Sequence, residues 1–64
     1  MNKEELKQLS EKMLDYRAKN NLSAEKFADR CNLTLVTIYN IENCKQVPSK
    51  MTLRKILNVI ESGV

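Results

Sequence analysis

The sequence lacks most of the residues on which metal binding and catalysis depend. None of its 64 residues is a histidine, and its two cysteines are Cys31 and Cys44. A structural zinc site needs four Cys or His ligands, so we expect no metal. It also has no glycine-rich phosphate loop, and a chain this short forms no deep cleft. We therefore expect no cofactor and no enzymatic activity, and Cys31 is expected to be a core residue.

Residues that interrupt helices are also scarce, with one glycine and one proline. β-branched residues do not alternate over any long run, so strand signals are weak and helices joined by short turns are favoured. No apolar run approaches the roughly 18 residues of a membrane span, and the polar N-terminus does not resemble a signal peptide. The sequence predicts one all-α domain over residues 1–64, located in the cytoplasm without membrane contact.

The whole chain has a net charge of +3, and its positive charge is concentrated in the later part. Residues 1–15 carry three lysines and four acids, a balance of 3 − 4 = −1. Residues 16–64 carry eight lysines or arginines and four acids, a balance of 8 − 4 = +4. An anionic partner for the later part is consistent with this distribution but not required by it.

Capping residues and apolar spacing predict four helices. They cover about residues 3–19, 24–31, 35–43 and 50–61, and Gly63 is expected to end the last one. Asn21 and Asn32 suit the left-handed conformation that closes a helix. The predicted N-caps are Asn2, Ser23, Thr34 and Ser49, and the first helix carries an apolar stripe of Leu6, Leu9, Met13 and Tyr16.

The second and third helices are separated by about three residues. So short a connection forces the two axes to cross steeply, which predicts a helix-turn-helix over about residues 23–43. The outward face of the third helix carries no charge, whereas a solvated face normally holds Lys and Glu. That face consists of Val36, Tyr39, Asn40 and Asn43, with Leu35 beside it.

An uncharged face of this kind can read the base edges of duplex DNA. The Asn40 amide can form two hydrogen bonds with adenine, and the methyls of Val36 can meet thymine methyls. The same stripe could instead pack on another helix or subunit. Candidate phosphate contacts surround it, and they are Lys26, Lys45, Gln46 and Lys50.

Between Leu22 and Pro48 the chain contains Leu22-Ser23-Ala24-Glu25-Lys26-Phe27-Ala28, Leu33-Thr34, Thr37-Ile38, Ile41-Glu42 and Pro48. In these residues it resembles the Cro/repressor-type helix-turn-helix family, also called XRE-like or lambda-repressor-like. The resemblance implies a compact bundle of four to five helices and a small prokaryotic or phage-type transcriptional regulator, expected to be a repressor. It implies double-stranded DNA as partner, the helix at about 35–43 in the major groove, and a homodimer.

The resemblance also implies roles for individual residues. Arg17 and Glu42 match a family pair that bridges the first helix to the third and would fix the orientation of the recognition helix. Base-reading positions fall on Thr34, Leu35, Val36 and Asn40, with Tyr39 adjacent. Phosphate-contacting positions fall on Ala24, Asn43 and Lys45.

Three departures from the family pattern change these expectations. Ala24 replaces a glutamine, so a side-chain phosphate contact is lost there. Cys44 replaces a glycine, so the loop after the third helix is expected to be strained or differently shaped. Leu35 and Val36 replace polar readers, so readout should depend on thymine methyls and DNA shape.

An alternative function is a protein-interaction module of the same fold, such as an antitoxin-like or accessory subunit. The modest charge and the apolar residues on the third helix support it. Binding that weakens steeply with salt would favour DNA instead. A dimer would have to use the domain itself, and candidate contacts are Val59, Ile60 and Val64.

Overall fold

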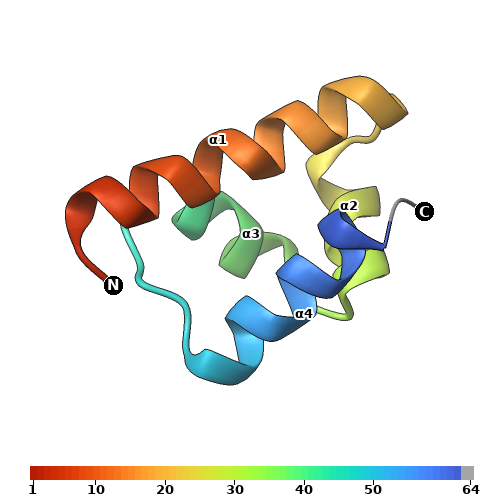
Figure 1. Ribbon diagram of the computed structural model, residues 1–64. Helices are drawn as coiled ribbons and strands as arrows, with labels where there is room; N and C mark the ends of the chain where they lie inside the picture. The colour runs from red at the N-terminus through yellow and green to blue at the C-terminus, as the bar shows by residue number, and fades with distance from the viewer. Residues whose placement is uncertain (63–64) are drawn as a thin grey trace.

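Four α-helices follow one another in the computed structural model of the protein, which describes residues 1–62. They are α1 (Lys3–Asn20), α2 (Ala24–Cys31), α3 (Leu35–Glu42) and α4 (Lys50–Glu61) (Figure 1). The predicted all-α fold is therefore confirmed, with helix ends within one residue of those expected. The expectations for Gly63 and Val64 lie outside the described residues. Within residues 1–62, none of the helices combines the length and apolar character that crossing a bilayer would require.

Each helix begins at the predicted capping residue. The Asn2 side chain accepts the Glu5 backbone N–H (2.8 Å) while the Glu5 carboxylate accepts the Asn2 backbone N–H (3.0 Å), which is a complete capping box. The hydroxyls of Ser23, Thr34 and Ser49 each accept the backbone N–H three residues ahead. These bonds satisfy N–H groups that lack a partner within the helix, so they fix where each helix starts.

The first three helices end in the same backbone arrangement. Asn21 (φ 53°), Asn32 (φ 57°) and Cys44 (φ 58°) are left-handed. Each is followed by a residue whose N–H bonds back five positions, as Lys45 does to the Asn40 carbonyl (2.8 Å). The loop after α3 thus keeps the shape of the other two, so of the two outcomes expected for Cys44, strain or a different shape, the second does not occur. The strain remains, because the side chain of Cys44 is disfavoured where asparagine is tolerated.

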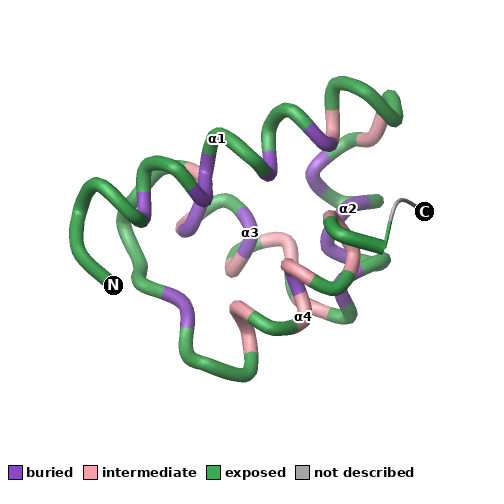
Figure 2. Tube along the Cα trace, in the orientation of Figure 1, coloured by how far each residue is buried: buried purple, intermediate pink, exposed green. Residues whose placement is uncertain are grey.

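The core lies where α1 and α2 each pack against both α3 and α4. Figure 2 shows the buried positions on the sides of the helices that face one another. All four residues of the predicted α1 stripe are buried, and the rings of Tyr16 and Phe27 lie 5.5 Å apart. The largest fully buried side chains are Met13, Phe27, Ile38, Ile41 and Ile56. Because two of these belong to α3, the core holds one side of that short helix and leaves the other outside.

Candidate nucleic-acid interface

The outer face of α3 is open to solvent. Ile38 and Ile41 are fully buried, whereas Val36 is 66% exposed and Tyr39 is 49% exposed. Asn40, between these two sides, is half-buried. The uncharged stripe is therefore not packed inside the monomer, and its methyl, phenol and amide groups are available to a partner.

Two of the expected base-reading residues, at the start of α3, also have structural roles in the fold. Leu35 is half-buried and packs against the core cluster. The Thr34 hydroxyl accepts the Thr37 backbone N–H (3.2 Å) and lies 2.9 Å from the Thr37 hydroxyl. Thr34 therefore serves first as the cap of α3, and only part of Leu35 faces outward.

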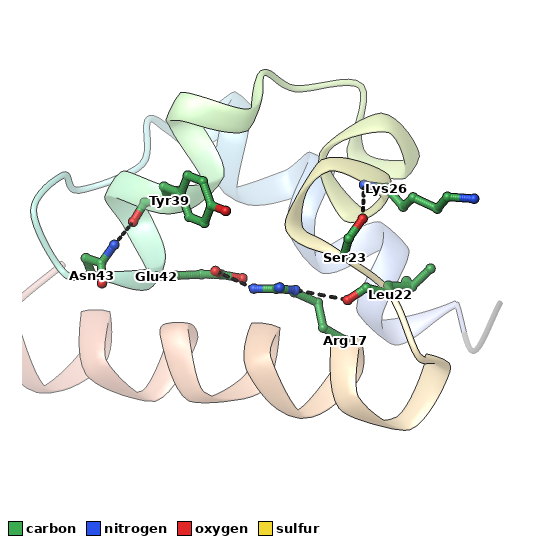
Figure 3. Close-up of polar contacts among 7 residues, drawn as sticks. All are labelled: Arg17, Leu22, Ser23, Lys26, Tyr39, Glu42 and Asn43. Carbon is green, nitrogen blue, oxygen red and sulfur yellow. Dashed lines mark hydrogen bonds and ion pairs between the residues drawn. The ribbon is translucent and has the colours of Figure 1, made fainter.

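Two amide side chains at the end of α3 already have hydrogen-bond partners. Asn40 Nδ2 donates to Gln46 Oε1 in the following loop (3.3 Å). Asn43 Nδ2 donates to the Tyr39 carbonyl (2.8 Å), one turn back (Figure 3). Each Nδ2 carries two N–H groups, so each keeps one for another acceptor.

The expected phosphate-contacting lysines are exposed and carry uncompensated charge. Lys26, Lys45 and Lys50 form no ion pair with any residue that the structure describes. Figure 3 shows the Lys26 side chain extending away from the start of α2, beyond its cap Ser23. Lys26 and Lys50 lie in first helical turns, where free backbone N–H groups add positive potential. Their charges are available to an anionic partner.

An ion pair ties α3 to α1. Arg17 Nη1 lies 2.7 Å from Glu42 Oε1, and Arg17 Nε donates to the Leu22 carbonyl (3.3 Å) (Figure 3). The Glu42 side chain is 5% exposed and that of Arg17 is 22% exposed. Glu42 Oε2 is buried without a hydrogen-bond partner. One guanidinium thus joins α1, the segment before α2 and the end of α3, which restricts how α3 can tilt.

A sequence model of the helix-turn-helix family matches residues 13–63, well over half of the chain. The chain belongs to the XRE-type helix-turn-helix family. This family consists of DNA-binding regulators rather than enzymes. The XRE-type protein is therefore a DNA-binding transcriptional regulator. No curated protein and no solved structure gave a significant match to it.

The departures of this XRE-type chain from the family pattern have structural consequences. Ala24 is buried in the core at the start of α2, so no side chain reaches outward where the family has glutamine. Cys44 is exposed, and its thiol donates to the Ser10 hydroxyl at 3.8 Å. Cys31 is buried, and burial raises the pKa of its thiol to about 11. No group of three His, Cys, Asp or Glu side chains within residues 1–62 is arranged to hold a metal ion.

Sequence reasoning missed the contact between Gln46 and Asn40 in this XRE-type protein. It gave them separate roles, base reading for Asn40 and a phosphate contact for Gln46. Their side chains meet because the loop closes through the bond from the Lys45 N–H to the Asn40 carbonyl. No periodicity signals such a contact, since it crosses a helix end. Sequence reasoning also gave no role at the interface to Val47 and Met51, which are 53% and 71% exposed.

Proposed function

We propose that this protein is a sequence-specific regulator of prokaryotic or phage type that acts as a repressor. The recognition helix, residues 35–43, would lie in the major groove of duplex DNA. The observation that carries the proposal is the outer face of α3, where exposed Val36 and Tyr39 and half-buried Asn40 present no charge. Occupation of an operator by such a domain would suffice to block transcription, which favours repression over activation.

Base reading would rest on one amide and a few apolar groups. Asn40 is suited to adenine, and a good bidentate pair contributes about 1–3 kcal/mol of discrimination. Val36 and Tyr39 are suited to thymine methyls. Thr34 and Leu35 would add contacts from the start of the helix, limited by the Thr34 cap and the partial burial of Leu35. The rest of the specificity would come from DNA shape.

Phosphate contacts would come from exposed polar groups, namely Lys26, Asn43, Lys45, Gln46 and Lys50. If the three lysines each neutralise one phosphate, the slope of log K against log salt is about −3 per subunit. The alternative, a protein-interaction module that binds through the apolar part of the same face, predicts only a small response to salt. A salt titration therefore separates the two functions.

We also propose that the protein binds as a homodimer on two half-sites about one helical turn apart. Val59 and Ile60 on α4 are half-buried and pack partly against the core. Their remaining apolar surface is our candidate for the two-fold contact. Sedimentation of the complex would give two protomers per operator, whereas one protomer per operator would contradict this part of the proposal.

Binding-site selection from random duplexes tests base reading directly. We expect the wild-type protein to enrich a short motif, and Asn40→Ala and Val36→Ala to change the selected bases at separate positions. Gln8→Ala on α1 is the control, because Gln8 is exposed and lies outside the proposed interface. An unchanged motif for both α3 variants would refute the assignment of the recognition helix.

A further inference from the structure

The loop after α3 is fastened to the residue that we propose reads adenine. The Lys45 N–H donates to the Asn40 carbonyl (2.8 Å), and the next residue, Gln46, accepts a hydrogen bond from Asn40 Nδ2 (3.3 Å). The backbone bond holds the loop close to Asn40, so the Gln46 side chain returns to the Asn40 amide. The two residues therefore form one unit at the edge of the outer face of α3.

We propose that Gln46 is a positioning residue that fixes the orientation of the Asn40 amide, and so the places of its Oδ1 and Nδ2 atoms, relative to a base pair. The inference rests on the proposed function, since it concerns how α3 distinguishes bases. A terminal amide can turn by 180° at little cost, because its last torsion is broad and nearly two-fold. The turn exchanges an acceptor for a donor, so it changes the base that the side chain accepts.

The polarity of the bond sets the orientation of the Asn40 amide. Gln46 Oε1 can only accept, so it holds Asn40 Nδ2 on its own side and turns Oδ1 away. A DNA phosphate strengthens this arrangement. Its oxygens also only accept, so a phosphate beside the loop takes an N–H from Gln46 Nε2 and leaves Oε1 directed at Asn40. The phosphate contact expected of Gln46 and its contact with Asn40 then support each other.

The orientation held in this way matches adenine. Asn40 Oδ1 is free to accept from adenine N6, and the second N–H on Nδ2 is free to donate to adenine N7. Guanine presents acceptors at both O6 and N7. Its O6 would therefore face Asn40 Oδ1, and two acceptors repel each other. Without Gln46, both N–H groups of Asn40 Nδ2 are free, so the amide can turn until it donates to guanine O6 and N7 together. Loss of Gln46 should therefore admit guanine at the base pair where the wild type requires adenine.

The experiment measures the affinity of the full chain for four duplexes that differ only at the base pair lost from the Asn40→Ala motif. We expect the wild type to prefer adenine over guanine by about 5- to 150-fold, the range for one bidentate pair. Gln46→Ala should reduce that preference to less than about 3-fold. Gln46→Glu keeps an acceptor for Asn40 Nδ2 but repels phosphate. It should retain the preference while binding all four duplexes more weakly.

Two variants complete the design. In the Asn40→Ala background, Gln46→Ala should leave the preference at this base pair unchanged, because Gln46 acts through Asn40. Gln8→Ala removes the other glutamine of the chain, far along the sequence on α1, and should match the wild type throughout. Gln46 is exposed, so its variants should melt at the wild-type temperature, and a melting curve for each variant checks this.

Several outcomes would overturn the inference. If Gln46→Ala weakened binding to all four duplexes equally and kept the preference for adenine, Gln46 would be a phosphate contact alone. If it changed the preference in the Asn40→Ala background, it would read the base itself. Failure of the wild type to select any site would overturn the proposed function and this inference with it. That outcome is distinguished from failure of the inference alone because it is seen with the wild type, before any variant is measured.

Discussion

The ion pair between Arg17 and Glu42 should respond unequally to loss of its two members. Both side chains lie in the same contact, but the Glu42 carboxylate is 5% exposed and the Arg17 side chain is 22% exposed. A charge left without a partner costs more where water cannot reach it. We therefore compare Arg17→Met with Glu42→Gln, since each variant keeps a side chain of similar length.

Arg17→Met removes the 2.7 Å contact and the 3.3 Å bond to the Leu22 carbonyl. It leaves a buried carboxylate whose Oε2 already lacks a hydrogen-bond partner. We expect a loss of about 3–5 kcal/mol in the free energy of unfolding. Glu42→Gln keeps an oxygen that accepts from Arg17 Nη1, and the partly exposed guanidinium retains water. We expect that variant to lose about 1–2 kcal/mol.

Urea unfolding followed by circular dichroism measures both losses. A domain of 64 residues has a total stability of only about 3–10 kcal/mol, so Arg17→Met needs a stabilising salt such as sulfate to stay folded. The double variant Arg17→Met/Glu42→Leu removes both charges and should be more stable than Arg17→Met alone. Equal losses for the two single variants, or losses below about 0.5 kcal/mol, would refute the argument that burial of Glu42 sets the cost.

Other predictions concern the cysteines and the interface charge. Cys44→Gly should raise the free energy of unfolding by about 0.5–1 kcal/mol by relieving the left-handed backbone, and Cys44→Val should lower it; melting curves showing no difference would contradict the strain. A thiol reagent should label exposed Cys44 at once and buried Cys31 only on unfolding, so equal rates would contradict the burial of Cys31. Burial raises the pKa of Cys31 from 9.0 to about 11, so the folded state binds more protons than the unfolded state between these values. Stability present below pH 9 should therefore fall as the pH rises through 11, and urea midpoints of Cys31→Ala should lack that part of the fall. Lys45→Ala should reduce the steepness of the salt dependence of DNA binding by about 1 per subunit, and an unchanged slope would exclude its phosphate contact.

The ends of the helices were predictable because the interactions that set them are local. Ser23 caps α2 through the N–H of Lys26, only three residues away. Asn21 and Asn32 were expected to be left-handed, and both are. The α1 stripe was predictable for the same reason, since helical spacing alone places its residues on one side.

Features of the interface that depend on tertiary packing were not predictable. Leu35 was expected to read bases, but the core takes part of its surface. The partnerless Oε2 atom of Glu42 follows from the way α1 lies against α3. The bond between Asn40 and Gln46 depends on how the chain closes after α3. Sequence patterns specify which face of a helix is apolar, but they do not specify how neighbouring segments divide that face.

The central claim is that DNA binds the outer face of α3, and an NMR titration tests it most directly. A ¹⁵N-labelled chain would be titrated with its selected duplex at low salt while the backbone amide shifts are recorded. We predict the largest changes at Val36, Tyr39, Asn40 and Lys45, and little change at Gln8 and Leu14 on the exposed side of α1. Changes concentrated on α1, with α3 unaffected, would contradict the account.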